Sequence, residues 1–182
     1  MNQQGFGFGE KAPPEMIRTA EMSECGVYRY RLSRVWEPDR GKMLFVMLNP
    51  SIADAEYDDP TIRKCVGFSK RWGYGGFDVV NLFAYRATKP AALKIAARNG
   101  VDVVGPDNDA VLDRMLRMRA GGTVVVAWGG SGGRLALERG RRVTAMIRDS
   151  AAEAYCLGKT TGRVPHPCHP VMLGYATPME KW

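Results

Sequence analysis

Long apolar runs are missing from the sequence. None approaches the ~20 residues that a membrane-spanning helix needs. The beginning, Met1-Asn-Gln-Gln-Gly-Phe-Gly7, also lacks the charged-then-apolar layout of a secretory signal. From the sequence we therefore expect a cytoplasmic protein that does not act on a membrane.

Cysteine and histidine, which bind most transition metals, are scarce. The four cysteines are scattered without a C-x-x-C pair, so buried or idle thiols are favoured over a zinc or iron–sulfur site. The chain has two histidines, His166 and His169, and both stand in one proline-rich segment. No compact ligand motif is present, and a dinuclear site made from Asp54, Asp58, Asp59 and a histidine is a minor alternative.

The remaining composition is that of a folded domain. Hydrophobic residues make up 45% of the 182 residues and charged residues 25%. Residues 1–15, rich in glycine and proline, predict a flexible arm, and residues 16–182 predict a single α/β domain. The net charge of +7 provides solubility, but it also favours a polyanionic partner such as DNA or RNA.

Apolar runs and helical periodicities alternate along the chain. Strand-like runs are followed by turns and then by apolar residues at helical spacing, which predicts a three-layer α/β domain with a mostly parallel central sheet. We expect the first two strands to form a hairpin. The predicted strands span residues 25–36, 43–48, 77–84, 123–129 and 154–158, and the predicted helices 61–72, 91–98, 109–118 and 134–149.

Polar segments follow four of these strands. The buried strand at 43–48 stops at Asn49-Pro50-Ser51 and is followed by a cluster of acidic residues. The other three segments are 81–88, 129–133 and 159–170. Because the carboxyl ends of parallel strands meet at one edge of a sheet, we expect a binding site there. Capping of the next helix by Asp59, with Pro60 at its first position, is the structural alternative for one acid.

Side chains at this edge suit several kinds of chemistry. An imidazole at His169, or less convincingly His166, can donate a hydrogen bond to developing negative charge or act as an acid or base. The amides of Asn49 and Asn81 can read a nucleobase edge or hold a water, or else they satisfy loose backbone groups. The glycine-rich segment 129–133 can bring backbone N–H groups to a phosphate, but it lacks a P-loop signature.

Eight blocks of sequence, which together span most of the chain, carry a further signal. The blocks are Phe45-Val-Met-Leu-Asn-Pro-Ser51, Asp58-Asp-Pro-Thr-Ile-Arg63, Trp72-Gly-Tyr-Gly-Gly76, Val80-Asn-Leu-Phe-Ala-Tyr-Arg-Ala-Thr88, Gly105-Pro-Asp-Asn-Asp109, Ala127-Trp-Gly129, Leu157-Gly-Lys-Thr160 and His169-Pro170. They resemble a bacterial and phage family known as a domain of unknown function, over about residues 25–175.

More remotely, the order of these blocks is similar to the uracil-DNA glycosylase superfamily. In that group the first strand ends in Asp-Pro or Asn-Pro, a middle strand in a base-reading Asn, another in Trp-Gly, and a late loop carries His-Pro. The Gly that usually precedes the first motif is absent, and Ser-Pro does not follow His169-Pro170.

The resemblance implies a DNA glycosylase with a uracil-DNA-glycosylase-like fold. It would remove a modified or damaged pyrimidine, with the glucosylated hydroxymethylcytosine of phage DNA as a suspected substrate and phage defence as the role. Such a reaction needs DNA flipped into a pocket but no metal, organic cofactor or obligatory protein partner. The implied residues are Asn49, Asp58 and His169 for catalysis, Asn81, Tyr57 and Phe83 for the base, and Ser51, Arg86, Ser131, Arg134, Lys159 and Arg163 for DNA.

Two other functions are compatible with the residues. A nucleic-acid-binding module on the same fold would keep the positive charge but would not need Asn49 or His169. A hydrolase or transferase of free nucleosides or nucleotides would use the acidic cluster to hold ribose or a metal, and it would need no long DNA.

Overall fold

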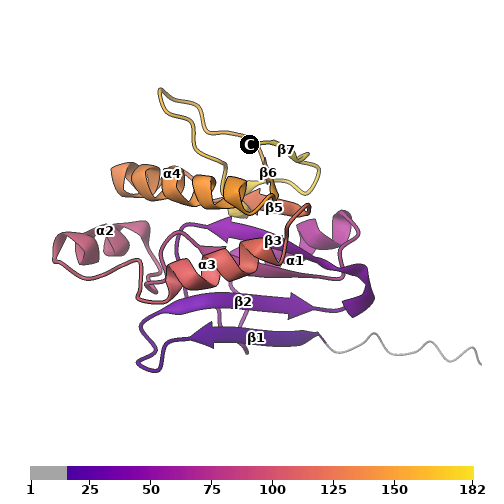
Figure 1. The fold of residues 1–182 in the computed structure, drawn as a ribbon, viewed down its shortest axis with the longest axis horizontal. Coiled ribbons are helices and arrows are strands. Elements are labelled where there is room, and N and C mark those ends of the chain that lie inside the picture. The colour runs from indigo at the N-terminus through magenta and orange to yellow at the C-terminus, as the bar shows by residue number, and fades with distance from the viewer. Residues whose placement is uncertain (1–15) are drawn as a thin grey trace, which may run out of the picture.

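A seven-stranded sheet runs through the part of the chain that the computed structural model describes, residues 16–182 (Figure 1). The arm expected at residues 1–15 lies outside the described residues. The strands are β1 (Ile17–Met22), β2 (Arg29–Val35), β3 (Lys42–Met47), β4 (Gly76–Asn81), β5 (Thr123–Val126), β6 (Glu153–Cys156) and β7 (Glu180–Lys181). The α-helices are α1 (Pro60–Arg71), α2 (Pro90–Arg98), α3 (Asn108–Arg117) and α4 (Gly133–Asp149), and short 3-10 helices cover Pro38–Arg40 and Pro170–Met172.

The sheet is mixed rather than mostly parallel. Its strand order is β1-β2-β4-β3-β5-β6-β7. The four central strands, β4, β3, β5 and β6, run parallel to one another, whereas β1, β2 and β7 join antiparallel at the two ends. The α/β prediction is confirmed, and the parallel part is the part that carries the polar loops.

The predicted hairpin between the first two predicted strands is wrong. β4 lies between β2 and β3 and pairs with both of them. The chain that leaves β2 is tied to the start of β4, because the backbone N–H groups of Trp36 and Glu37 both donate to the carbonyl of Gly75. β4 is buried along its whole length, so pairing on both of its edges satisfies its backbone groups.

Strands β1 and β7 were not predicted from the sequence. Both are edge elements, and most of their residues are partly or fully exposed. β7 contains two residues only, and Ile17 of β1 is 56% exposed. Neither segment has the run of buried apolar residues by which the central strands were recognised.

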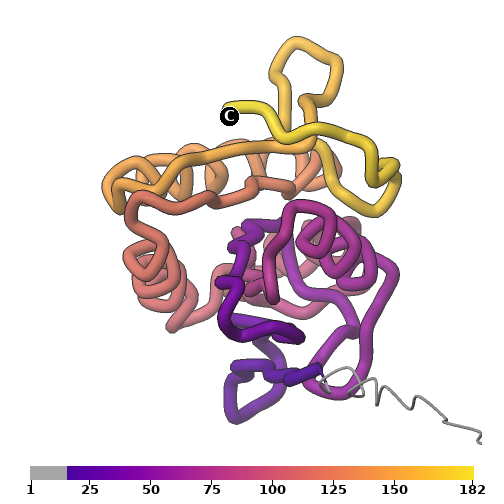
Figure 2. The backbone as a smooth tube through the Cα atoms, turned by 90° about the vertical axis from the view of Figure 1, so that its right-hand side faces the viewer, coloured from indigo at the N-terminus to yellow at the C-terminus, as the bar shows by residue number. Residues whose placement is uncertain are grey.

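Helices cover both faces of the sheet. Leu44, Val46 and Val80 pack with the buried residues of α2, α3 and α4, whereas Phe45 and Val79 pack with α1. This alternation follows from the period of two along each strand. Figure 2 shows α1 and α3 on opposite sides of the sheet. No helix among residues 16–182 is both long enough and apolar enough to span a membrane.

Candidate functional site

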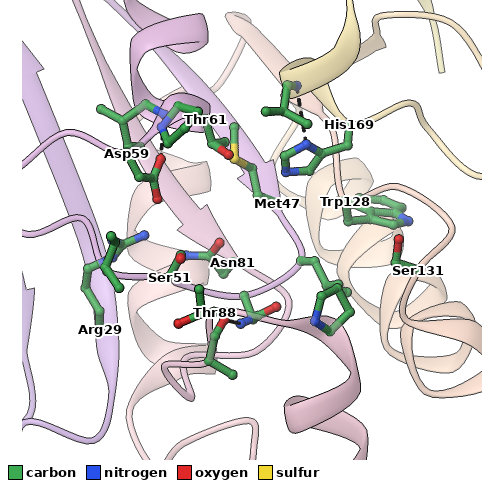
Figure 3. A pocket seen from close by; sticks show the side chains of 18 of the residues that line it. Arg29, Met47, Ser51, Asp59, Thr61, Asn81, Thr88, Trp128, Ser131 and His169 are labelled. Carbon is green, nitrogen blue, oxygen red and sulfur yellow. Dashed lines mark hydrogen bonds between the residues drawn. The ribbon is translucent and has the colours of Figure 1, made fainter.

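A cavity of about 500 Å³ lies at the carboxyl ends of the parallel strands (Figure 3). The loops that follow β3, β4, β5 and β6 all contribute to its wall, as the predicted parallel order requires. Five of the site residues predicted from the sequence line this cavity: Asn49, Ser51, Asn81, Ser131 and His169. Side chains that were separated by up to 120 residues in the sequence therefore share one site.

Asn49 holds two loops together and keeps one polar atom free for a ligand. Its Nδ2 donates to the carbonyl of Pro50 at 2.9 Å and to that of Ala87 at 2.8 Å. The backbone N–H of Ala87 donates in turn to the Pro50 carbonyl at 2.9 Å. Both bonds of the side chain use the nitrogen, so Oδ1 is the atom available to accept a hydrogen bond in the cavity.

Asn81 is the last residue of β4 and is 1% exposed. Its Nδ2 has no hydrogen-bond partner within the described residues, which is costly for a buried donor. Its backbone is fixed from behind, because the side chain of Asn108 in α3 donates to the carbonyls of Asn81 and Leu82, each at 3.1 Å. This rigid, unpaired amide is well suited to bind a ligand that brings its own acceptor.

His169 presents Nε2 rather than Nδ1 as its hydrogen-bond donor. Its Nδ1 accepts from the backbone N–H of Val171 at 3.3 Å and caps the short helix Pro170–Met172. In the neutral ring the proton is then on Nε2. Burial lowers the pKa of His169 below its ordinary 6.5, although the negative charge of Asp59 opposes part of that shift. The imidazole is consequently neutral at pH 7.

The glycine-rich loop after β5 makes room for this histidine. Gly129 has a φ of +67°, and a Cβ there would lie 3.2 Å from the Cβ of His169. The N–H of Gly129 donates to the carbonyl of Pro167 at 2.9 Å, which joins the two loops. Gly129 thus positions the His169 loop, and Ser131 is the part of this loop that reaches the cavity.

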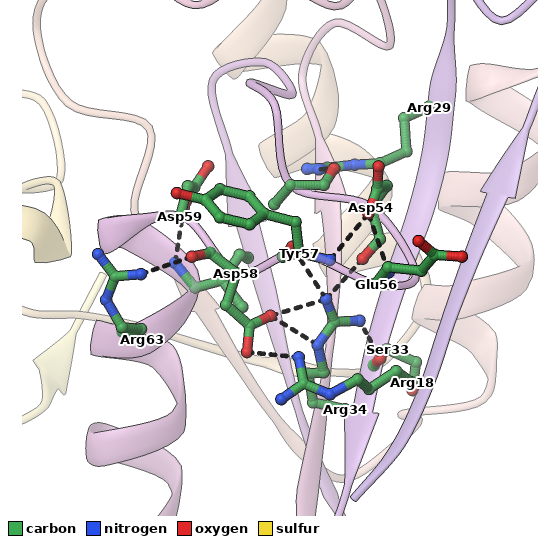
Figure 4. A network of polar contacts seen from close by, with 12 residues as sticks. Arg18, Arg29, Ser33, Arg34, Asp54, Glu56, Tyr57, Asp58, Asp59 and Arg63 are labelled. Atoms are coloured by element: carbon green, nitrogen blue, oxygen red, sulfur yellow. Dashed lines mark hydrogen bonds and ion pairs between the residues drawn. The ribbon is translucent and has the colours of Figure 1, made fainter.

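Asp58 does not line the cavity, contrary to the sequence prediction. Its carboxylate pairs with the fully buried Arg34 at 2.7 Å and with Arg18 at 2.7 Å (Figure 4). Arg34 also donates to the carbonyls of Asp54 and Tyr57, and these hydrogen bonds hold the loop between β3 and α1 in place. Asp58 is the counter-ion of this buried cation and is therefore occupied.

Asp59 is the acid that faces the cavity. It is 6% exposed and lies on the cavity wall, with Arg29 nearby on the same side of Figure 3. One of its oxygens accepts from the backbone N–H of Ile62 at 2.9 Å and caps α1, so the predicted N-cap and Pro60 at the first helical position are both confirmed. Its second oxygen is left for the cavity.

Arg29 is a cavity residue that sequence reasoning missed. It is 3% exposed, its Nη1 donates to the carbonyl of Ala53, and its Nε has no partner among the described residues. Burial lowers the pKa of Arg29 to about 10, and the charge of Asp59 works against that shift. Residues 25–36 were predicted as a strand, but nothing in the local sequence distinguishes Arg29 from the other arginines of that strand, Arg31 and Arg34.

The two aromatic residues expected to stack on a base lie outside the cavity. Tyr57 is 51% exposed and Phe83 is 1% exposed in the core on the α2–α4 side, and neither lines the cavity. Phe83 lies just beyond β4, where its N–H donates to the carbonyl of Leu48 and its ring packs into the core. The aromatic side chain of the cavity wall is Trp128, from the Trp-Gly block.

The basic residues predicted to bind DNA lie outside the cavity. Arg86 donates to the carbonyl of Gly26 at 3.3 Å, and Arg134 pairs with Glu138 at 2.7 Å. Lys159 stands 5.5 Å above the ring of Trp182. Arg163 is exposed in the loop after β6. Contacts of these four side chains with DNA remain predictions.

Each of the acids suggested as metal ligands already accepts at least one hydrogen bond from the protein. Asp54 accepts from the backbone N–H groups of Glu56 and Tyr57, at 2.9 Å each, while Asp58 and Asp59 have the partners described above. Within residues 16–182, no three or more His, Cys, Asp or Glu side chains are grouped to hold a metal ion. All four cysteines are free thiols, with Cys65 and Cys156 buried.

The model of one protein family, described as "Protein of unknown function (DUF1643)", matches residues 29–171. The chain belongs to this family. The DUF1643 match begins at Arg29 and ends at Val171, so it contains every cavity residue discussed above. No curated protein and no solved structure matches the chain.

Proposed function

We propose that this DUF1643 protein is a DNA glycosylase that hydrolyses the N-glycosidic bond of a modified or damaged pyrimidine and leaves an abasic site. The observation that carries the proposal is the convergence of Asn49, Asp59, Asn81 and His169 on one cavity. These residues supply a proton donor, two acceptors and a free amide around a space of about 500 Å³. The reaction needs donors on the side of the base and acceptors on the side of the sugar.

On the base side, His169 stabilises the leaving group. As the bond between C1′ and the base nitrogen breaks, its electron pair passes to the base, and negative charge develops on a base oxygen. The Nε2–H of a neutral His169 donates to that oxygen. Asn81 donates to another acceptor on the base edge, which gives its unpaired Nδ2 a partner.

On the sugar side, Asn49 and Asp59 hold the attacking water. Oδ1 of Asn49 and the uncapped oxygen of Asp59 each accept a hydrogen bond from this water. As the water oxygen bonds to C1′, one proton passes to Asp59 and the other stays on the new hydroxyl. The negative charge of Asp59 also stabilises the oxocarbenium-like sugar, as a carboxylate does in glycoside hydrolysis. Asp59 replaces Asp58 in this role because Asp58 neutralises Arg34.

The size of the cavity favours a bulky base. A volume of about 500 Å³ falls in the range of cavities that enclose drug-sized ligands. A bare pyrimidine would leave much of it empty, whereas a glucosylated hydroxymethylcytosine would use more of the space. A substrate of that kind in phage DNA implies a role in antiviral defence.

The surroundings of the cavity favour a base that is turned out of a DNA strand. Met172 at the rim is 88% exposed and Ile52 is 49% exposed. Apolar side chains in such positions can occupy the gap that an extruded base leaves in the stack. The net charge of +7 attracts the phosphates. Helices on both faces of a sheet with a parallel centre also support a three-layer fold of the uracil-DNA glycosylase type.

The decisive experiment measures base release. Plain, uracil-containing and glucosylated phage DNA are incubated with the protein, and free base and alkali-labile sites are quantified. We expect release from the modified DNA, at least a hundredfold slower release with His169→Ala, and normal release with Arg117→Gln, an exposed control on α3.

Two results would replace the proposal with an alternative. DNA binding without release from any substrate would leave a nucleic-acid-binding module. Cleavage of free nucleosides without any action on DNA would identify a nucleoside hydrolase.

A further inference from the structure

A second cavity, of about 330 Å³, lies along α4 and shares Trp128 with the first one. Ala136, Gly140 and Thr144 of α4 line one side, and Pro165, His166 and Trp182 also contribute to its wall. Trp128 lines both cavities, so they are neighbours that share this indole. Nothing in the proposed chemistry of the first cavity uses the second.

The arginines of α4 divide into two groups. Arg134 pairs with Glu138, and Arg139 and Arg142 both pair with Asp109. The other two arginines of α4, Arg141 and Arg148, have no acid partner within residues 16–182. Both of these line the second cavity. They are seven residues apart, which places them on one face of the helix at a spacing of about 10 Å.

Aromatic rings form the other part of this cavity. The rings of Trp128 and Trp182 meet edge to face with centroids 5.8 Å apart. Gly140 allows the close approach, because a Cβ there would lie 3.2 Å from the Trp128 ring. Lys159 adds a cation 5.5 Å from the Trp182 ring centroid. The second cavity therefore combines the charges of Arg141 and Arg148, which lack acid partners, with the partly exposed indole of Trp182.

We propose that this groove binds a single-stranded segment of DNA, with phosphates on Arg141 and Arg148 and a base against Trp182. Guanidinium groups without acid partners suit phosphate, and an aromatic side chain beside a cationic track is how proteins hold single strands. The inference rests on the proposed function in one respect: the segment belongs to the strand whose extruded base enters the first cavity. Trp128 as a common wall brings the two sites close enough for one strand.

The test is binding of a fluorescent oligothymidylate by anisotropy over a series of salt concentrations. The double variant Arg141→Gln/Arg148→Gln should bind at least tenfold more weakly, and the slope of log K against log salt should become shallower by about 1.4, because about 0.7 is lost per phosphate contact on single strands. The control, Arg117→Gln/Arg142→Gln, removes the same charge from arginines that have acid partners and should retain the wild-type slope.

The stacking contact has its own test. Trp182→Ala should weaken oligothymidylate binding about tenfold without changing the salt slope, and Trp182→Phe should keep most of the affinity. An oligonucleotide that consists of abasic sugar-phosphate should bind wild type and Trp182→Ala equally. Melting temperatures of all variants near that of the wild type show that the changes act at the surface.

The outcomes separate this inference from the glycosylase proposal. An equal loss of affinity and slope in both double variants would overturn the groove, and so would a preference for duplex over single strand that neither Arg141 nor Arg148 affects. Loss of binding that is specific to the groove variants, in a protein that releases no base, would support the groove and overturn the glycosylase. Base release by the wild type, together with unchanged oligothymidylate binding by the groove variants, would support the glycosylase and overturn the groove.

Discussion

Several side chains of the first cavity have two tasks, one for each polar atom. Asn49 uses Nδ2 to join two loops, Asp59 uses one oxygen to cap α1, and His169 uses Nδ1 to begin a short helix. In each case the second atom is left for a ligand with its orientation already fixed. Preorganisation of this kind lowers the cost of stabilising charge during the reaction.

Asp58 and Asp59 are adjacent but should respond differently to the same change. Asp59→Asn removes the charge from the cavity, but asparagine is also a good N-cap, so the fold should survive while base release falls roughly a hundredfold. Asp58→Asn leaves the buried Arg34 without its counter-ion and should lower the free energy of unfolding by about 3 kcal/mol.

Urea unfolding and rates of base release on both variants check this prediction. Asp59→Ala, which also loses the cap, should lower the free energy of unfolding by about 1 kcal/mol more than Asp59→Asn does. Equal rates for Asp59→Asn and the wild type would remove Asp59 from the mechanism.

The protonation of His169 gives a prediction about pH. Because burial lowers its pKa, its imidazole should titrate below 6.5 and carry the proton on Nε2 when neutral. The unfolded chain takes up this proton more readily, so the contribution of His169 to stability is complete above about pH 6.5 and is lost as the pH falls. Long-range ¹H–¹⁵N NMR of a His166→Gln variant, which retains a single histidine, measures both the titration and the tautomer. A midpoint above 6.5 would contradict the proposed environment.

At the scale of elements, short contacts between turns decide which strands become neighbours. The N–H of Gly75 donates to the carbonyl of Gly41, and the carbonyl of Gly75 accepts from Trp36 and Glu37. These bonds bring the end of β2 and the start of β3 to the start of β4. The sequence predicted the turn and both flanking strands, but it did not show that a third strand enters between them.

Gly75→Ala should disturb this junction. An added Cβ would lie 1.7 Å from the carbonyl oxygen of Glu37, so the backbone must move, and we expect a loss of about 2 kcal/mol or more in the free energy of unfolding. Gly174→Ala is the matched control, because a Cβ there meets nothing within 4 Å. Chemical unfolding followed by circular dichroism compares the two variants. Equal stability would show that the junction adapts without cost.

At the scale of the whole molecule, one buried carboxylate joins distant parts of the chain. Asp78 in β4 is fully buried and pairs with Arg31 of β2, Lys42 of β3 and Arg119 after α3, each at 2.9 Å. Burial raises the pKa of Asp78, but the hydrogen bond and charge of Lys42, the charge of Arg31 and the hydroxyl of Ser33 outweigh it and leave the pKa below its ordinary 3.8.

Asp78→Asn should lower the free energy of unfolding by about 3 to 5 kcal/mol at pH 7. A lowered carboxyl pKa stabilises the fold above the ordinary pKa, and that contribution is lost as the pH falls through the folded value. The difference between wild type and variant should therefore shrink below about pH 4. Urea titrations from pH 7 to pH 3 measure it. Asp113→Asn, in an exposed pair with Arg117, should change stability by only tenths of a kcal/mol.

The sequence by itself determined the order of the five strands β2 to β6 and of the four α-helices, and the edge of the sheet where a site would form. The apolar runs of β3, β4 and β5, the periodicity of the helices and the Asp59-Pro60 start of α1 are local signals, because burial and capping act over a few residues. For the same reason Asn49 and Asn81 were recognised at strand ends, and His169 in the polar loop that follows the last predicted strand.

Only the tertiary structure decided which of two neighbouring acids faces the cavity, that Arg29 and Arg34 are buried, and that Phe83 belongs to the core. Each of these depends on groups that are distant in the sequence: Asp58 pairs with Arg18 and Arg34 outside the cavity, and Phe83 packs with buried residues of α2, α3 and α4. A residue pattern records whether a side chain is polar, whereas its partner and direction depend on how the sheet brings remote loops together.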